Sequence, residues 1–495
     1  MYYLGLDIGS SSIKVALVGI ANGRLVGVVQ EPASEMEMIA LKNGWAEQDP
    51  RDWWRYVCKG IKNIKEKYKV SQNQIKGIGI AYQMHGLVLL DKEGNPVRNA
   101  IIWCDSRAVE IGRNAYASIG EEKCKKHLLN SPANFTASKL KWVKENEAET
   151  YQKAHKLMLP GDYIAYCFSS VMNTTISGLS EGILWDFKED SVAHLVLDHY
   201  GISNSLIPDI VDTFGLQSKV DAQGAKESGL AQGTPILYRA GDQPNNALSL
   251  NVFKPGEVAA TGGTSGVVYA VTDTLSGKES TRVNNFAHVN YTKKNPHIGK
   301  LLNINGAGIQ YRWLLKNLEV DSYDEMNALA KEIPVGSDGV CLIPFGNGAE
   351  RMLNNRDIGA RLLNVNLNNH HKGHLCRAAL EGIAFSFAYG MEILKQDGID
   401  IESMRAGNDN LFRSEIFSNT LACLVNQEIE IYDTTGAIGA ARAAGIYEGG
   451  FEKFSTYITH NDHLHTFKPC EDNGKYLKAY EAWKKELELI MNSNK

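Results

Sequence analysis

The chain opens with the stretch that decides its fold, residues 2–20, which read YYLGLDIGSSSIKVALVGI. Apolar runs at 2–6 and 13–20 flank a polar turn, and a third run follows at 24–30. This alternation predicts three strands of antiparallel sheet. Asn22-Gly23, between the second and third runs, indicates a type I′ hairpin turn, because both residue types tolerate positive φ.

The first turn, Asp7 to Ser12, is rich in glycine and serine. Such a turn leaves backbone N–H groups free to converge on an anion, and a phosphate suits that arrangement. An ordinary tight turn is the alternative, and the turn alone does not decide between them. The candidate phosphate-binding residues are Gly9, Ser10, Ser11, Ser12 and, on the returning strand, Lys14.

A second copy of this pattern lies near the middle of the chain. GSSSIKVA at 9–16 aligns with GTSGVVYA at 263–270, an offset of 254 in 495 residues. Each copy combines a turn bearing hydroxyl groups with an apolar returning strand, so the repeat predicts two related lobes. We expect lobes at 1–245 and 246–495, and a second phosphate loop at Gly263, Thr264 and Ser265.

The remaining elements predict an α/β fold in both lobes. A helix begins at Asp49-Pro50, an N-cap followed by the residue that fits the first helical position. The other expected elements are strands at 75–81, 235–237, 257–261, 267–271 and 428–432, helices at 374–396 and 414–425, and a helix of small residues at 437–446 that can pack closely on a sheet or ligand.

Composition excludes several classes of function. Lys and Arg number 52 against 57 Asp and Glu, which leaves a net charge of −5 and disfavours nucleic acid as a partner. No apolar run reaches the roughly 18 residues of a membrane span, and the N-terminus lacks the features of a signal peptide, so a cytoplasmic protein without a membrane partner is expected. The eight cysteines contain no C-x-x-C pair, which predicts reduced thiols.

Asp242 follows an apolar strand close to the expected lobe boundary. A carboxylate at a strand end can accept a proton from a substrate hydroxyl. The same residue can instead cap the helix that follows. The local sequence leaves both interpretations open.

Two further groups of side chains follow apolar runs in the first half, where α/β folds display residues that contact ligands. Met84 and His85 come after the strand at 75–81, and Trp103 and Asp105 come after the run Ile101-Ile102. A single histidine in such a place is more often structural. Together the two groups predict a polar pocket. No G-x-x-x-x-G-K-[ST] and no protein-kinase motif occurs, so any ATP site has another architecture.

These motifs, in this order, resemble the FGGY carbohydrate kinases of the actin, hexokinase and Hsp70 fold superfamily. The resemblance covers nearly the whole chain. It rests on DIGSSSIKV at 7–15, WAEQDP at 45–50, QMHG at 83–86, IWCDSR at 102–107, FTASKLKWVKEN at 135–146, Gly241-Asp242, GTSG at 263–266 and the helix that begins near His374.

The resemblance implies two RNase H-like lobes around a central cleft and an ATP-dependent sugar kinase. It implies that Asp242 accepts the proton of the 5-hydroxyl of D-xylulose as this oxygen attacks ATP, and that Asp7 organises Mg²⁺. The expected sugar contacts are Met84, His85, Trp103, Asp105 and Asp242, and the expected phosphate contacts are the two loops. A dimer is common in the family, so a homodimer is the expected assembly.

The sequence departs from the family in the C-terminal nucleotide loop. This loop, usually three glycines, reads Ala406-Gly407-Asn408-Asp409 here, and Gly407 and Asn408 are taken as nucleotide contacts, with a two-residue shift in register left open. Other acceptors of the family (ribulose, gluconate, fuculose or a seven-carbon ketose) are alternatives to D-xylulose, because a fold does not fix its substrate. A nucleotide switch like actin or Hsp70 is the alternative outside the enzyme class.

Overall fold

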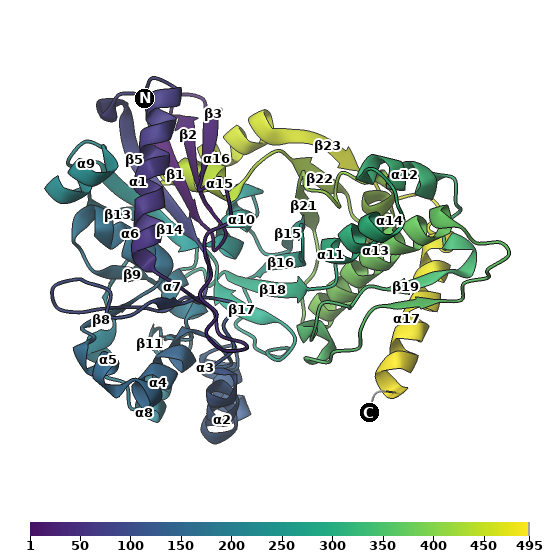
Figure 1. Cartoon of the computed structure of the whole chain (residues 1–495), viewed down its shortest axis with the longest axis horizontal. Helices are drawn as coiled ribbons and strands as arrows, with labels where there is room; N and C mark the ends of the chain where they lie inside the picture. The colour runs from purple at the N-terminus through teal and green to yellow at the C-terminus, as the bar shows by residue number, and fades with distance from the viewer. Residues whose placement is uncertain (494–495) are drawn as a thin grey trace.

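The computed structural model describes residues 1–493 and contains two large mixed sheets, one in each half of the chain (Figure 1). The strands at 2–8, 13–19 and 25–31 pair antiparallel as the sequence predicted. In spatial order the first sheet consists of β13 (Phe214–Lys219), β14 (Pro235–Gly241), β5 (Ile75–Tyr82), β1 (Tyr2–Ile8), β2 (Ile13–Gly19) and β3 (Leu25–Glu31).

The second sheet repeats this topology. β15 pairs antiparallel with β16 and parallel with β21, as β1 pairs with β2 and β5. In spatial order it consists of β17 (Asn284–Ala287), β18 (Ile298–Ile304), β16 (Gly266–Thr272), β15 (Glu257–Gly262), β21 (Ser403–Gly407), β22 (Ile429–Tyr432) and β23 (His463–Phe467). The fold class, two α/β lobes of related topology, is therefore confirmed. The boundary at residue 245 stays a prediction.

Small strand pairs and helices complete both halves. The short strands are β4 (Glu47–Gln48), β6 (Val88–Leu90), β7 (Ala100–Ile101), β8 (Lys156–Met158), β9 (Asn173–Thr175), β10 (Trp185–Asp186), β11 (Ser191–Val192), β12 (Asp209–Val211), β19 (Cys341–Ile343) and β20 (Arg361–Leu363). The helices of the first half are α1 (Pro50–Lys67), α2 (Val109–Ile119), α3 (Glu121–His127), α4 (Thr136–Asn146), α5 (Ala148–Lys153), α6 (Pro160–Ser169), α7 (Ile176–Glu181), α8 (His194–Tyr200) and α9 (Ala222–Ser228).

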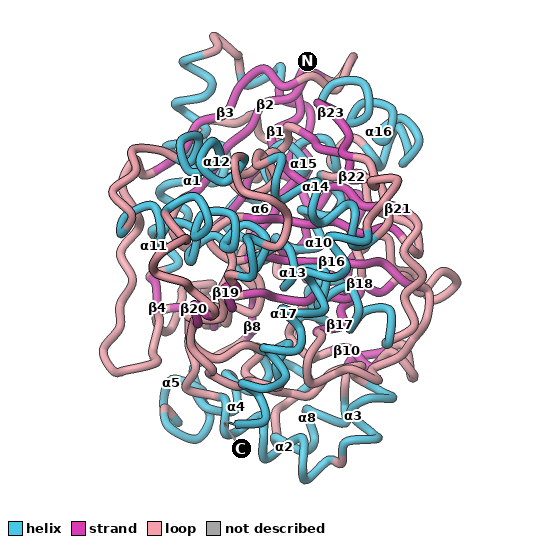
Figure 2. The backbone as a smooth tube through the Cα atoms, turned by 90° about the vertical axis from the view of Figure 1, so that its right-hand side faces the viewer, coloured by secondary structure: helices cyan, strands magenta, loops and turns pink. Residues whose placement is uncertain are grey.

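The remaining helices come after β14, most of them in the second half of the chain. They are α10 (Asp242–Ser249), α11 (Gly308–Asn317), α12 (Tyr323–Lys331), α13 (Lys372–Gln396), α14 (Glu415–Val425), α15 (Gly436–Ala443), α16 (Ile446–Asp462) and α17 (Gly474–Ser493). The buried helix α13 packs on β16 and β18. Figure 2 looks onto the outer side of this half, where α13, α14 and α17 lie.

The helix of small residues, α15, packs on the sheet of the other half. Its partners are β1, β2 and β5, and both views show α15 beside β1 and β2 (Figures 1 and 2). The approach is close because both surfaces lack bulk: a Cβ on Gly5 would lie 1.9 Å from the Ala437 carbonyl oxygen, and one on Gly79 would lie 1.9 Å from that of Ala440. The predicted close packing on a sheet is therefore confirmed, and α15 joins the two halves.

The turn between β2 and β3 differs from the predicted type I′ turn. Of its two central residues only Gly23 has a positive φ, of 63°, whereas type I′ requires both. The Gly19 amide donates to the Arg24 carbonyl oxygen at 2.9 Å, so the loop is wider than two residues. The ring of Tyr457 from α16 packs directly on Gly23, and this tertiary contact selects the wider loop.

The prediction of eight free thiols is wrong for one pair. Cys423 and Cys470 form a disulfide, and the cysteines recorded as free are Cys58, Cys104, Cys124, Cys167, Cys341 and Cys376. The paired residues are 47 positions apart in the sequence, so short-range spacing carries no sign of the bond. Within residues 1–493, no helix has the length and apolar character needed to cross a membrane.

Candidate functional site

The first glycine- and serine-rich turn is the tip of the β1–β2 hairpin. Gly9 donates its amide to the Ser12 carbonyl oxygen at 3.1 Å, which closes the turn, while Ser11 is exposed. The Gln48 amide group donates to the Ser10 carbonyl oxygen at 2.7 Å and so fixes the turn from outside. Lys14 lies opposite Asp7 in the hairpin register, where its charge favours the ionised form of that acid.

The second turn, Gly263 to Ser265, is the equivalent tip of the β15–β16 hairpin. Gly263 and Thr264 are exposed, and the start of α11 closes against them. The Ile309 amide donates to the Thr264 carbonyl oxygen at 2.9 Å, and a Cβ on Gly308 would lie 2.1 Å from the Gly263 carbonyl oxygen. The chain therefore carries two topologically equivalent polar hairpin tips, one on each sheet.

Asp242 is the first residue of α10 and directly follows β14. Gly241, not Asp242, occupies the N-cap position, which removes capping as the reason for this acid. Burial, and then the nearby charge of Asp7, raise the pKa of Asp242 to about 7. Burial also raises the pKa of Asp7. The structure therefore brings together the two acids that the sequence proposed for the chemistry.

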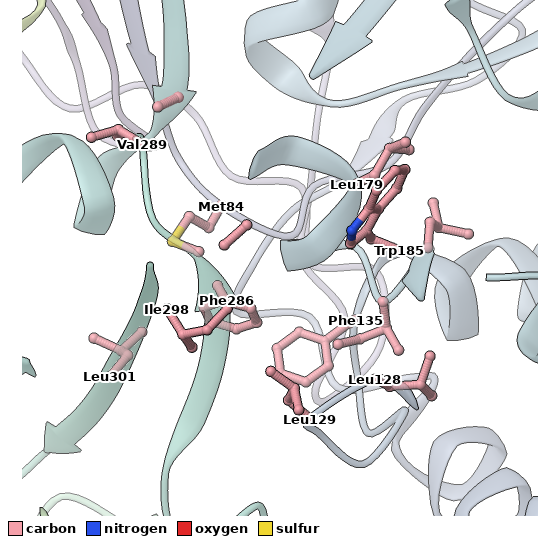
Figure 3. Packing of buried hydrophobic residues seen from close by; sticks show 14 of the residues in the cluster. Met84, Leu128, Leu129, Phe135, Leu179, Trp185, Phe286, Val289, Ile298 and Leu301 are labelled. Carbon is pink, nitrogen blue, oxygen red and sulfur yellow. The ribbon is translucent and has the colours of Figure 1, made fainter. Parts of the chain in front are cut away.

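Met84 lies in a core that both halves of the chain build (Figure 3), and His85 packs against rings of that core. The His85 ring packs against Phe135 of the first half and Phe286 on β17, with centroid distances of 4.6 Å and 5.2 Å. Burial lowers the pKa of His85 to about 3, so its ring is neutral. Its Nδ1 lies 2.9 Å from the Glu181 carbonyl oxygen. Because a carbonyl only accepts, we assign the proton to Nδ1, and Nε2 remains an acceptor.

Lys139 is a buried cation beneath these residues that the sequence did not single out. Its Nζ donates to the carbonyl oxygens of His85 and Ile102, both at 2.9 Å. Burial lowers its pKa to about 7. The φ of His85 is 61°, a left-handed conformation that non-glycine residues rarely adopt, and the lysine supports it. Lys139 thus positions both segments that the sequence assigned to the sugar.

Trp103 and Asp105 differ sharply in what they can contact. The side chain of Trp103 is 54% exposed, and its Nε1 donates to Ser10 Oγ at 3.3 Å. Asp105 is fully buried, and its carboxylate accepts from the Ala46 amide at 2.6 Å and from the Arg107 guanidinium at 2.7 Å. Trp103 therefore lies at the first hairpin tip, whereas the oxygens of Asp105 hold the WAEQDP segment in place.

The atypical C-terminal loop is built around Asp409. Its Oδ2 accepts from the Gly262 amide at 2.5 Å, and its Oδ1 accepts from the Phe412 amide at 3.2 Å. Burial raises its pKa to about 6. Gly407 ends β21 with open space beside it, and the Asn408 amide donates to the Tyr432 carbonyl oxygen at 3.0 Å. Asp409 thus ties the end of β21 to the strand that leads into the second hairpin tip.

Two polar hairpin tips on equivalent sheets, with a pair of neighbouring half-buried acids, suit a two-lobed enzyme that transfers a phosphoryl group. The model of the FGGY family of carbohydrate kinases, N-terminal domain, matches residues 2–249, and that of the C-terminal domain matches residues 258–447.

Individual relatives agree. A xylulose kinase of Bacillus subtilis is 26% identical over 91% of this chain and 89% of its own, and an L-xylulose/3-keto-L-gulonate kinase of Escherichia coli is 28% identical over 92% and 90%. The crystal structure of xylulose kinase from Rhodospirillum rubrum shares the fold, with a TM-score of 0.89, 22% identity and 99% of each chain covered.

The chain belongs to the FGGY family of carbohydrate kinases. It is accordingly an ATP-dependent kinase that acts on a small sugar, which decides against the nucleotide-switch alternative.

Proposed function

We propose that the protein phosphorylates D-xylulose at its 5-hydroxyl, with Asp242 as the general base. The observation that supports this role is the pKa of Asp242, about 7, in a carboxyl at the end of a central strand. A base whose pKa lies near the working pH is charged often enough to accept a proton and basic enough to hold it. Asp242 would take the hydroxyl proton as that oxygen attacks the terminal phosphorus of ATP, and ADP leaves.

The residues around Asp242 fit a magnesium ion. Asp7 and Asp242 are neighbouring acids, and each disfavours the charge of the other. Magnesium in kinases is held by one or two carboxylates together with substrate phosphates, so a cluster of several protein ligands is not needed. Asp7 would hold the ion, which supplies charge neutralisation at the ATP phosphates. Gly436 leaves room for this, since a Cβ there would lie 2.9 Å from Asp7 Oδ2.

The chain's own polar groups would hold the rest of the substrates. Amides and hydroxyls at Ser10 to Ser12 and Gly263 to Ser265, all of them exposed or half-buried residues, would bind the charged phosphoryl oxygens. The Nε2 acceptor of His85 and the side chain of Met84 would orient the sugar, and Trp103 would border both substrates. Asp105 would act through Arg107 and Ala46, as a residue that positions the sugar segment.

A small cavity beside the second hairpin tip suits the adenine. The cavity measures about 60 Å³. Tyr311 and Tyr323 line it, and their rings stack with a centroid distance of 5.0 Å. Asn410 and Leu411 line it, whereas Gly407 and Asn408 do not. This supports the two-residue shift in register for the adenine contacts.

The pH dependence of the reaction tests the role of Asp242. Burial and Asp7 favour the neutral acid, so below about pH 7 the base is protonated and cannot accept a proton. We expect kcat/KM for the sugar to fall about tenfold per pH unit below that value and to level off above it, with ATP kept well below its KM. A profile that is flat from about pH 5.5 to 8 in the wild-type enzyme contradicts the assignment.

Removing the Asp409 carboxyl is expected to weaken ATP binding. In Asp409→Ala the Gly262 and Phe412 amides lose their acceptor, and the second hairpin tip loses its support. Hydrogen bonds to charged groups contribute about 1.5–3 kcal/mol, so the KM for ATP should rise by about tenfold or more while the sugar KM changes little. Asp409→Asn keeps an acceptor oxygen and should show a smaller rise. An unchanged KM for ATP in Asp409→Ala excludes this role.

A panel of sugars with coupled ADP detection tests the acceptor. D-xylulose, L-xylulose, ribulose, gluconate, fuculose and a seven-carbon ketose would be compared at equal concentration. The highest kcat/KM on D-xylulose supports the proposal, and no turnover of D-xylulose removes it. L-xylulose is the second candidate because one relative, at 28% identity, carries that sugar in its name. The homodimer and the cytoplasmic location stay predictions.

A further inference from the structure

Glu181 is a buried acid beside the sugar site to which no role has yet been assigned. It is the last residue of α7 and is 1% exposed. Its Oε1 lies 3.4 Å from the His85 amide, which donates to it. Its Oε2 has no hydrogen-bond partner in the part of the chain that the structure describes. A buried polar atom without a partner lowers the stability of the fold by about 1–3 kcal/mol. A carboxylate that binds a ligand at this place would offset that loss.

The unpartnered oxygen points at the residues that the sugar would meet. Glu181 Oε2 and Met84 Cγ lie 2.3 Å and 2.6 Å from the place where a Cβ on Gly241 would stand. Gly241 directly precedes Asp242. The free oxygen, the Met84 side chain and the end of β14 therefore converge on one point, next to the catalytic acid of the proposed reaction.

Burial, together with two neighbouring acids, favours the protonated form of Glu181. Burial raises its pKa most, the charge of Asp242 raises it further and Asp162 adds to this, while the His85 amide and Lys139 act in the opposite direction. Two carboxyls that share a buried site do not both ionise readily. A protonated carboxyl can donate a hydrogen bond as well as accept one, which suits a sugar hydroxyl.

We propose that Glu181 binds a hydroxyl of the acceptor sugar other than the one that Asp242 deprotonates, and that it thereby determines which sugars the enzyme accepts. The inference rests on the proposed function in so far as the acceptor is a polyhydroxylated sugar bound at Met84 and His85. A site built to bind a hydroxyl strongly rejects an analogue that lacks it, because the protein group is then left buried and unpaired. Glu181 is already in this unpaired state without a sugar.

The experiment is a thermodynamic cycle. It compares kcat/KM of the wild type and of Glu181→Gln, each with the best acceptor from the panel and with monodeoxy analogues of that acceptor. Glutamine keeps the size of the side chain and an oxygen for the His85 amide, and it changes the group at Oε2. We expect the variant to lose about tenfold or more in kcat/KM with the parent sugar and to differ less than about twofold from wild type with one deoxy analogue. The KM for ATP should stay unchanged.

The controls separate a contact from a structural role. Glu381→Gln alters another buried glutamate, one whose oxygens are taken by Arg377, Gly336 and Ser337, and should leave the ranking of the sugars unchanged. If Glu181→Gln does not fold, Glu181→Asp, which withdraws the carboxyl by one methylene, takes its place in the cycle.

Equal losses with the parent sugar and every deoxy analogue, or no loss at all, overturn the inference. A wild-type enzyme that prefers another sugar overturns only the D-xylulose proposal, and the cycle is then run on that sugar.

Discussion

In the Asp242→Asn variant, kcat is expected to fall by about 10²- to 10⁴-fold, the contribution typical of a positioned general base. Asparagine has nearly the same shape but no basic oxygen, so the acceptor hydroxyl keeps its proton as it attacks. Sugar binding should change little, because Met84 and His85 are untouched. Steady-state kinetics and sugar titration by calorimetry measure the two effects separately.

Asp209→Asn is the matched control, since Asp209 on β12 is exposed. It should behave as wild type. Turnover of Asp242→Asn within a few-fold of wild type would show that another group accepts the proton. Loss of sugar affinity equal to the loss of kcat would make Asp242 a binding residue only.

The second large effect is on stability. Gly79→Ala places a Cβ 1.9 Å from the carbonyl oxygen of Ala440 on α15. Gly79 belongs to β5 and Ala440 to α15, so neither can shift without moving its whole strand or helix. Overpacking a well-filled core costs typically about 1–3 kcal/mol, and a clash with backbone lies at or above the upper end. We expect a loss of about 3 kcal/mol or more in the free energy of unfolding, measured by urea denaturation.

Gly449→Ala is the control for this change. The three nearest atoms to a Cβ there all belong to the flexible side chain of Lys453, and alanine suits a helix better than glycine. Its stability should equal or exceed that of the wild type. A Gly79→Ala protein as stable as this control would mean that α15 shifts without cost, and that the packing between the halves is loose.

Much of the fold could be predicted because its local patterns are strong. The hairpin of β1 and β2, the helix that begins at Pro50 and the repeat at 263–270 all appear at the expected places. What could not be predicted depends on contacts between distant segments. The loop at Gly23 follows from the Tyr457 ring. The choice of the first sheet as the docking surface of α15 follows from Gly5 and Gly79, which are far before it in the chain.

The residues of the candidate site likewise fall into those that the sequence indicates and those that only the structure reveals. Asp7, Met84, His85 and Asp242 were accessible from the sequence because each follows an apolar strand or belongs to a motif. Glu181 was not, since an acid at the end of a short helix resembles a surface residue until tertiary packing buries it. Lys139 lies within the segment FTASKLKWVKEN at 135–146, which resembles the family. Its contacts with two carbonyl oxygens are visible only in the folded chain.

The correspondence between the two sheets also shows where the two halves differ. α10 follows β14 in the first half as α15 follows β22 in the second. The first of these helices begins with an acid, Asp242, whereas the second begins with Gly436, where the missing side chain makes room for Asp7. In the proposed reaction, this single difference between two copies of one topology would give the molecule an acceptor side at Asp242 and a donor side opposite it.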